Sequence, residues 1–240
     1  MQRRADAPKL QLLEIGAGWD LYANLIYWCY GFENQIAIDV RRWARAETVN
    51  AAIAHLAKDP PPAALRVPKI KLDAASFETS LKEVYGIRYL APLDASSTDL
   101  PASSIDVICT TSVFEHIPEQ VLAAILKEFR RIIRPDGMMT HTIDFTDHYS
   151  HADPAITDFN YLQFGNRQWM RHNPGIHFQN RLRTRDFRRL IEDADFDVSE
   201  CEEWGGRPSE LDRTAVHPDF KHYRREELLV IGANLIAKPK

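Results

Sequence analysis

The sequence predicts an α/β protein with a doubly wound, mostly parallel sheet and helices on both of its faces. An apolar strand over residues 10–15 leads into the glycine turn 16–18, and an apolar helix over residues 21–32 follows. A second apolar strand, residues 35–38, ends in Asp39, about twenty residues beyond the glycines, where doubly wound folds place an acidic residue. Apolar strands and helical patterns then keep alternating along the chain, which is the third observation in favour of this fold.

Length, charge and cysteine usage set limits on the kind of protein. The 240 residues, of which 45% are hydrophobic, suit one domain with a substantial core, and we expect residues 1–240 to form it. The net charge of −4 provides no basic field, so nucleic acid is not expected as a partner. Three cysteines in apolar settings favour free thiols in a reducing cytoplasm. The apolar run 21–32 is too short to span a bilayer, so we expect a cytoplasmic protein with neither a signal peptide nor membrane insertion.

Prolines and glycines mark the elements that follow the second strand. The spacing predicts a helix over 41–57, which ends before the proline run at 60–62. Residues 59–86 are expected to be an insertion that contains a short helix over 77–85. Residues 87–90 form the third predicted strand.

Local sequence patterns also predict the strands and the helix in the middle of the chain. A polar turn leads into a fourth apolar strand, which ends in hydroxyl residues that include Ser112. An amphipathic helix is predicted over 118–133, with Pro118 in its first turn. A turn at 134–137 then precedes the fifth strand, residues 138–144.

Two long segments of the C-terminal half, residues 145–183 and 205–227, are candidate lids or substrate segments. In the first, aromatic residues alternate with Asn, Gln and Arg; rings can stack on the apolar face of a sugar while amides and guanidiniums bind its hydroxyls. A small aromatic core would need a similar composition, so both possibilities stay open. The remaining elements are a helix capped by Thr184 and two final strands, residues 196–204 and 228–237.

The residues around the glycine turn favour one class of nucleotide. A dinucleotide fingerprint would have a third glycine where Leu21 stands, and a phosphate loop would need a Gly-Lys-Ser/Thr sequence that this turn lacks. Glu14, two residues before the first glycine, is a poor neighbour for a pyrophosphate and suits a cation better. The pattern Glu14-x-Gly16-x-Gly18 with Asp39 resembles the class I S-adenosylmethionine-dependent methyltransferases.

This resemblance implies the cofactor and its contacts. The cofactor is expected to be S-adenosyl-L-methionine, with Glu14 facing its cationic methionine end, Asp39 on the ribose and Asp94 on the adenine amine; for Asp94 a turn cap is the alternative. The full set of expected cofactor residues is Glu14, Gly16, Ala17, Gly18, Asp39, Asp94, Ala95 and Ser112. The resemblance also implies a seven-stranded sheet whose last strand is antiparallel. His116, in a Glu-His pair that many relatives share, is expected to have a structural role; a contact on the cofactor side is the alternative.

A cluster of histidines and carboxylates follows the fifth strand, on the side where the family places its substrate. We expect Asp144, His148 and His151 to be catalytic, with one of the two histidines deprotonating an acceptor hydroxyl. A metal site is a second possibility, ranked lower because the spacing matches no specific ligand motif, and no metal is predicted. A polar loop with hydrogen-bonded histidines is the third.

The expected activity is O-methylation of a hydroxyl on a sugar, a glycan or another small molecule. Two alternatives come from other classes. An NAD-dependent oxidoreductase shares the fold pattern, but the third glycine and a Tyr-x-x-x-Lys sequence are missing. A nucleotide-binding protein with a decayed site would have lost its acids, whereas residues 14, 39 and 94 are all acidic. The sequence does not predict an oligomeric state.

Overall fold

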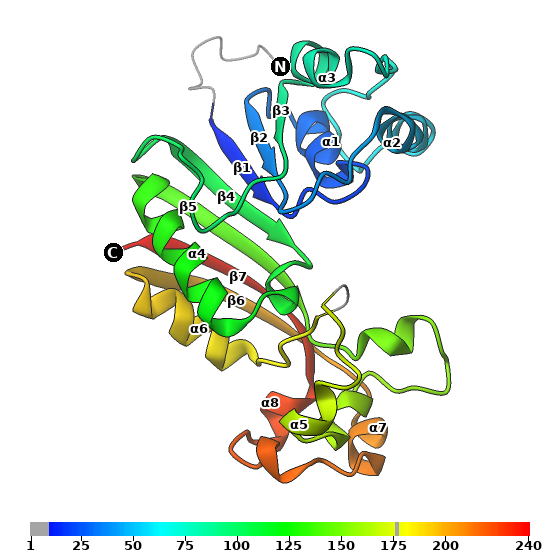
Figure 1. The fold of residues 1–240 in the computed structure, drawn as a ribbon, viewed down its shortest axis with the longest axis vertical. Coiled ribbons are helices and arrows are strands. Elements are labelled where there is room, and N and C mark those ends of the chain that lie inside the picture. Colours follow the sequence, from blue (N-terminus) through cyan, green and yellow to red (C-terminus); the bar gives the residue numbers. More distant parts are fainter. Residues whose placement is uncertain (1–9, 176–177) are drawn as a thin grey trace. The chain divides into compact units, whose positions relative to one another are not determined.

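The computed structural model describes residues 10–175 and 178–240 and contains the predicted seven-stranded sheet (Figure 1). The strand order is β3-β2-β1-β4-β5-β7-β6, and the last strand is antiparallel. The strands are β1 Leu12–Ile15, β2 Gln35–Ile38, β3 Ile87–Leu90, β4 Ile105–Thr111, β5 Ile133–Asp144, β6 Phe196–Gly205 and β7 Val230–Pro239. The predicted fold class is confirmed.

The chain divides into two compact units. The first unit contains residues 10–110 and 127–139 together with Pro239, and the second contains residues 111–126 and most of the chain from Thr140 onward. The helix α4, Glu119–Ile132, and the strand β5 contribute to both. That residues 1–240 act as one domain stays a prediction.

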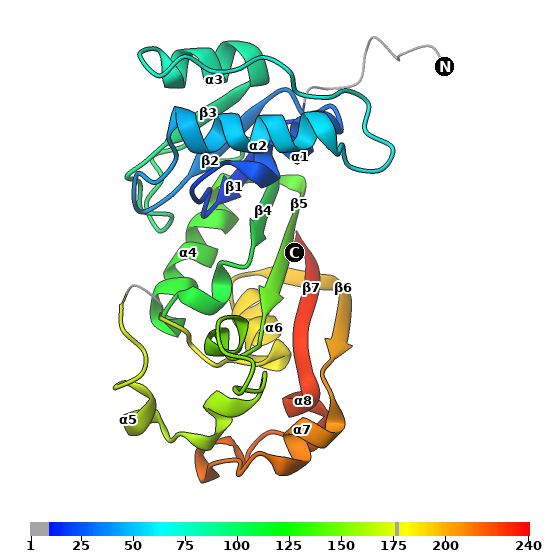
Figure 2. The ribbon, with the colours of Figure 1, turned by 90° about the vertical axis from the view of Figure 1, so that its right-hand side faces the viewer.

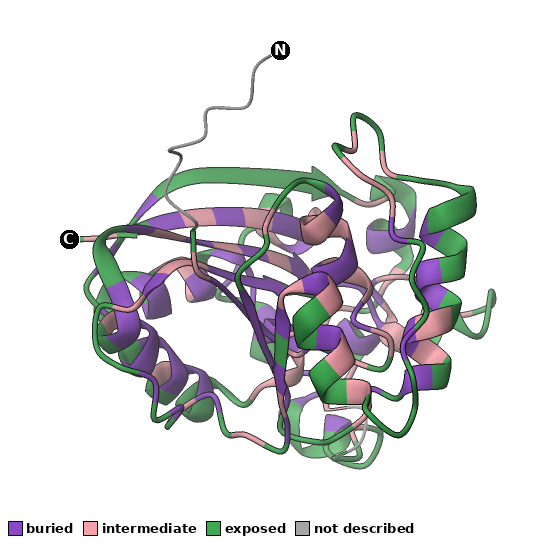
Figure 3. Cartoon of the chain, turned by 90° about the horizontal axis from the view of Figure 1, so that it is seen from above, coloured by how far each residue is buried: buried purple, intermediate pink, exposed green. Residues whose placement is uncertain are grey.

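The first unit is built around three helices: α1 (Tyr22–Cys29), α2 (Ala46–Lys58) and α3 (Phe77–Tyr85). In α2 the buried residues recur at helical spacing, and the helices of the structure show buried residues on one side and exposed residues on the other (Figure 3). Figure 2 shows α2 lying alongside α1. The apolar faces of α1, α2 and α3 share one core, which includes Leu21, Leu25, Val49, Ile53, Leu56, Leu81 and Tyr85.

The bounds of α3 and β3 agree with the prediction, whereas α1 and α2 are shorter than predicted. The helix α1 ends at Cys29, and Gly31 then has a φ of 100° that no helix contains. The helix α2 begins at Ala46 rather than at residue 41. The backbone amides of Trp43 and Ala44 donate to the hydroxyl of Tyr89 instead of to a preceding helical turn. A tertiary contact therefore delays the start of this helix.

Gly86, between α3 and β3, is a position at which we expect a large effect on stability. Its φ of +66° is left-handed, and a Cβ there would clash with the carbonyl oxygen of Glu33. Since the backbone must move as well as adopt a strained conformation, Gly86→Ala is expected to lower the free energy of unfolding by about 3 kcal/mol or more in urea titrations. The matched control is Gly175→Ala, because a Cβ on Gly175 would meet no atom within 4 Å. Equal stability of the two variants would contradict the argument.

In the second unit the helix α6, Thr184–Asp193, packs along β6 (Figure 2). Phe187, Leu190 and Ile191 are buried on its inner face, as predicted. The prediction that Thr184 caps the helix is wrong. Arg183 is the N-cap residue, because the carboxylate of Asp186 accepts a hydrogen bond from the Arg183 amide at 2.9 Å.

The two candidate lid segments share a core of their own. They contain three short helices, α5 (Asn166–Trp169), α7 (Pro208–Arg213) and α8 (Arg225–Leu229). Phe159, Tyr161 and Trp169 are at most 5% exposed, so their rings pack inward and are not open stacking surfaces. The small aromatic core that the sequence left open is therefore present. Its buried members are Phe159, Tyr161, Leu162, Trp169, Leu211, Phe220, Tyr223 and Leu228. That the segments act as lids stays a prediction.

The last strands differ from their predicted bounds. The strand β5 already begins at Ile133, so residues 134–137 belong to it rather than to a turn. Arg134 forms an ion pair with Asp106 at 3.0 Å, and a Cβ on Gly137 would touch the carbonyl oxygen of Asp106, so this stretch lies close beside β4. The strand β7 begins at Val230, because α8 occupies the preceding residues. Among the described residues, no helix combines the length and the apolar character that crossing a membrane requires.

Candidate functional site

The glycine turn between β1 and α1 is held against the end of β2. Gly16 and Gly18 have φ values of 76° and 70°, a conformation that favours glycine. The amides of Gly16 and Ala17 both donate to the carbonyl oxygen of Ile38, and the amide of Gly18 donates to the Asp39 carboxylate at 3.1 Å. The sequence motif therefore forms a compact turn with Asp39 beside it.

Asp39 also links the turn to the loop that carries Asp94. Its carboxylate accepts a second hydrogen bond from the Arg41 amide at 2.9 Å, and its carbonyl oxygen accepts one from the Leu93 amide at 2.8 Å. Since β1, β2 and β3 are parallel neighbours, their carboxyl ends bring Glu14, Asp39 and Asp94 to one edge of the first unit.

Asp94 makes the contacts of a turn cap. Its carboxylate accepts hydrogen bonds from the amide and the hydroxyl of Ser96, both at 2.8 Å, and these bonds lower its pKa. Ala95, the next residue, is buried. A contact of this loop with adenine stays a prediction.

Glu14 is the most unusual group at this edge. Its side chain is 3% exposed, and its Oε2 atom has no hydrogen-bond partner among the described residues. Burial raises the pKa of the Glu14 carboxyl to about 8. A buried carboxyl with an unsatisfied oxygen is energetically costly, which makes Glu14 a candidate for contact with a ligand.

The pKa of Glu14 predicts a pH-dependent stability. Between its ordinary pKa of 4.5 and about 8, the folded protein keeps the Glu14 proton whereas the unfolded chain loses it, so the free energy of unfolding falls as pH rises through this window. Without cofactor, Glu14→Gln should therefore be more stable than the parent at about pH 8, by an amount on the order of a few kcal/mol. Near pH 4 this advantage should be absent. Urea titrations at both pH values test this. If the difference in free energy of unfolding between Glu14→Gln and the parent does not change with pH, the prediction is wrong.

Ser112, the remaining expected cofactor residue, belongs to the second unit. It follows β4, is exposed, and has a φ of 53°. Its amide donates to the carbonyl oxygen of Thr142 at 2.9 Å. This bond fixes the crossing from β4 to the short 3-10 helix η1, Phe114–His116.

The structure brings the three expected catalytic residues together in the second unit. Asp144 ends β5, and both histidines lie on the short 3-10 helix η2, His148–His151. The Oδ2 atom of Asp144 is 3.6 Å from His148 Nε2 and 3.7 Å from His151 Nε2, and the two imidazole rings stack with centroids 5.0 Å apart. A further contact joins His151 Nε2 to the hydroxyl of Thr146 at 3.0 Å. The carboxylate is thus placed to orient either ring.

His141, three residues before Asp144 on β5, has a different environment. It is fully buried and stacks on Phe114, with ring centroids 4.1 Å apart. Burial lowers its pKa to about 3, so the imidazole is neutral in the folded protein. It belongs to the core rather than to the group around Asp144.

Glu115 was not predicted from the sequence as a candidate site residue, yet its environment is unusual. It is 2% exposed, and neither of its carboxylate oxygens has a hydrogen-bond partner of ordinary geometry among the described residues. Burial raises the pKa of the Glu115 carboxyl to about 8. Its neighbour His116 has the expected structural contact, since its Nδ1 atom lies 2.8 Å from the carbonyl oxygen of Phe178. The available signal was an acidic residue among apolar neighbours in the sequence 113–117.

Comparison with known proteins agrees with this architecture. A family model described as a methyltransferase domain matches residues 2–200. No curated protein matches the sequence.

Several solved structures resemble the chain at low sequence identity. A SAM-dependent methyltransferase from Methanosarcina mazei is 13% identical, with a TM-score of 0.50 over 95% of this chain and 92% of that one. Geranyl diphosphate C-methyltransferase from Streptomyces coelicolor A3(2), in complex with Mg²⁺, geranyl diphosphate and S-adenosyl-L-homocysteine, is 8% identical, with a TM-score of 0.54 over 98% and 73%. Magnesium protoporphyrin IX methyltransferase from Synechocystis PCC 6803, with bound SAH, is 11% identical, with a TM-score of 0.51 over 96% and 74%. These similarities show a shared fold.

Proposed function

We propose that this chain, which belongs to the methyltransferase domain family and uses S-adenosyl-L-methionine as its cofactor, methylates a hydroxyl group of a sugar, a glycan or another small molecule. Family membership favours the methyltransferase over both the oxidoreductase and the nucleotide-binding protein without activity. The observation that supports a hydroxyl acceptor is the convergence of Asp144, His148 and His151 beyond the end of β5. A hydroxyl must lose its proton on methylation, and a histidine of this cluster can act as the base that removes it.

The residues at the edge of the first unit fit the cofactor. Glu14 has a buried, unsatisfied oxygen, and an approaching cation would satisfy it. We propose that Glu14 faces the methionine end, that Asp39 binds the ribose hydroxyls, and that Asp94 contacts the adenine amine. The other residues proposed to line the cofactor are Gly16, Ala17, Gly18, Ala95 and Ser112. When bound, the cofactor supplies a methyl group that its sulfonium has already activated.

Of the two histidines, His151 is the better candidate for the base. Its side chain is 55% exposed, compared with 22% for His148, so an acceptor reaches it more easily. With Thr146 and Asp144 both beside Nε2, its Nδ1 atom remains available to take the proton of the acceptor hydroxyl. Asp144 then stabilises the imidazolium that forms, as a carboxylate does for a histidine base. The bound cofactor would supply the methyl group to the acceptor oxygen, and the products would be a methyl ether and S-adenosyl-L-homocysteine.

Two measurements test this function. Calorimetry should show binding of S-adenosyl-L-methionine and none of NAD. Incubation with the cofactor and a panel of sugars and phenols should give S-adenosyl-L-homocysteine and a methyl ether, both identified by mass spectrometry. Each methylated acceptor is paired with the deoxy analogue that lacks the hydroxyl in question, and this analogue should not give the same methyl ether. Transfer only to nitrogen or carbon would overturn the assignment to O-methylation.

A further inference from the structure

Three side chains of types that can bind a metal ion converge in the second unit, on η1 and η2. Glu115, His116 and His148 each offer one ligand atom, and these atoms all lie within 4.8 Å of one another. The imidazole rings of His116 and His148 are in edge contact, with centroids 4.9 Å apart. The two histidines come from segments distant in sequence, so only the fold brings this set together.

The environment of Glu115 supports a ligand that is not part of the chain. Burial of a carboxyl is unfavourable when its oxygens have no hydrogen-bond partner, and within the described part of the chain both oxygens of Glu115 are in this position. The amides of Glu115 and Asp144 lie near enough to lower its pKa, but neither makes a hydrogen bond of ordinary geometry to it among the described residues. A cation bound at this point would satisfy the carboxylate directly.

His116 is already oriented as a metal ligand is. Its Nδ1 atom donates to the carbonyl oxygen of Phe178 at 2.8 Å, which leaves Nε2 as the nitrogen with a lone pair. Metal-binding histidines usually donate their second ring nitrogen in this way, and the bond fixes both the tautomer and the ring orientation.

We propose that Glu115, His116 and His148 bind one divalent transition-metal ion. Two imidazoles with one carboxylate are a donor set typical of Zn²⁺ or Fe²⁺, whereas Mg²⁺ and Ca²⁺ prefer oxygen donors. Tetrahedral ligands lie about 3.4 Å apart, so the widest pair has to approach by roughly 1–1.5 Å. Asp144, with Oδ2 3.6 Å from His148 Nε2, is the nearest candidate for a fourth ligand.

The ion would add a second way to activate the acceptor, and this part rests on the proposed function. A divalent cation lowers the pKa of a hydroxyl group whose oxygen it binds by several units. With His148 on the metal, His151 remains as the group that takes the proton. Metal binding itself needs neither the cofactor nor an acceptor, so it can be tested separately from methyl transfer.

The test is calorimetry with Zn²⁺ on the full chain, after dialysis against EDTA and without cofactor or acceptor. The parent should bind one Zn²⁺ in the micromolar range or tighter. Glu115→Gln and His148→Ala should each weaken this binding at least about a hundredfold, since each removes a ligand. Asp144→Asn reports whether the fourth ligand is this carboxylate. The control is His55→Ala, which removes an exposed histidine from α2 and should bind Zn²⁺ like the parent.

Two further readouts keep the test decisive. Thermal unfolding in EDTA verifies that each variant is folded, and Zn²⁺ should raise the melting temperature of the parent but not of Glu115→Gln. Absorption spectroscopy at the zinc edge should show two imidazole ligands. If the parent binds no Zn²⁺ below about 0.1 mM, or if Glu115→Gln and His148→Ala both bind it like the parent, the proposal is wrong and Glu115 is only a buried structural acid.

Discussion

Replacing His151 with alanine is expected to lower kcat for a hydroxyl acceptor by about 10²- to 10⁴-fold, the usual contribution of a positioned base. The KM for S-adenosyl-L-methionine should change little, because the proposed cofactor residues lie on other elements. The reason is chemical: without an imidazole at this place the acceptor hydroxyl keeps its proton and is a poor nucleophile. Steady-state kinetics on the parent and the variant measure the effect.

The controls separate a base from a residue that only supports the loop. His151→Ala should regain part of its activity at high pH or with added imidazole, which a merely structural defect would not allow. Asp144→Asn should lower kcat less than His151→Ala, since the base remains but loses its orienting carboxylate. His55→Ala is the matched control and should retain the parent rate. If His151→Ala and His148→Ala both keep full turnover, the histidines are not bases.

Replacing Asp39 with alanine should weaken the binding of S-adenosyl-L-methionine by about 10²- to 10³-fold. The carboxylate anchors the glycine turn through the amide of Gly18, it also accepts a hydrogen bond from the amide of Arg41, and it is the proposed partner of the ribose. Each hydrogen bond to a charged group contributes about 1.5–3 kcal/mol, so loss of the ribose contacts and of the turn anchor accounts for this range. Calorimetry gives the dissociation constant directly.

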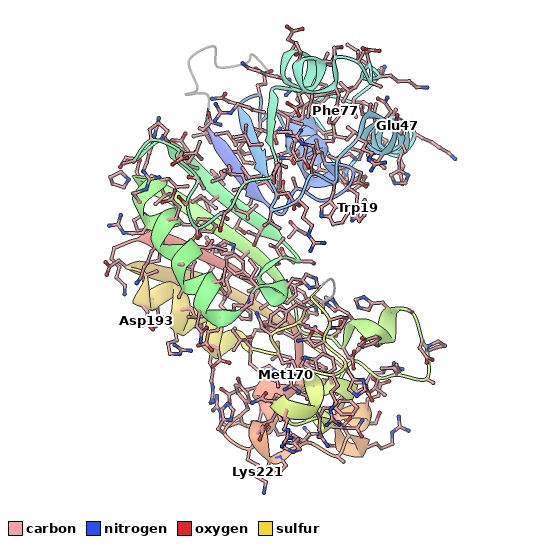
Figure 4. All side chains as sticks on the ribbon, in the orientation of Figure 1. Trp19, Glu47, Phe77, Met170, Asp193 and Lys221 are labelled. Atoms are coloured by element: carbon pink, nitrogen blue, oxygen red, sulfur yellow. The ribbon has the colours of Figure 1, made fainter. Side chains whose placement is uncertain are left out.

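The control for Asp39 is Glu47→Ala. Glu47 is an exposed acid on α2 of the same unit (Figure 4), and its loss removes the same charge from the protein. Asp39→Asn keeps the size of the side chain and should fall between the parent and Asp39→Ala. If the affinity of Asp39→Ala stays within threefold of the parent, the ribose assignment fails.

The sequence predicted those elements whose signals are local. The apolar strand before residues 16–18 and the turn itself are defined by neighbouring residues, and so is the helix α3, which ends at Gly86. The start of α2 could not be predicted, because it depends on the hydroxyl of Tyr89, far away in the sequence. Thr184 has a favourable residue type for a cap, but the contact of Arg183 with Asp186 decides where the helix begins.

The same distinction applies to the site. Asp144, His148 and His151 are neighbours in the sequence, so their association was predictable from spacing along one segment. Glu115 was missed because its environment is formed by residues from other elements, and burial cannot be read from one acidic residue. Phe159 and Tyr161 belong to a segment that the sequence did single out, but composition alone could not decide their role. The same aromatic residues could form an exposed stacking surface or a buried core, and the structure shows a core.

The core shared by residues 159–169 and 211–228 limits how these two stretches can change during evolution or engineering. Side chains from both stretches interlock, so each stretch supplies the apolar surface that the other covers. A graft of only one stretch from another family member would leave mismatched faces and empty volume in the chimera. The two stretches should therefore be exchanged as a pair, and homologous recombination between them should give few folded products.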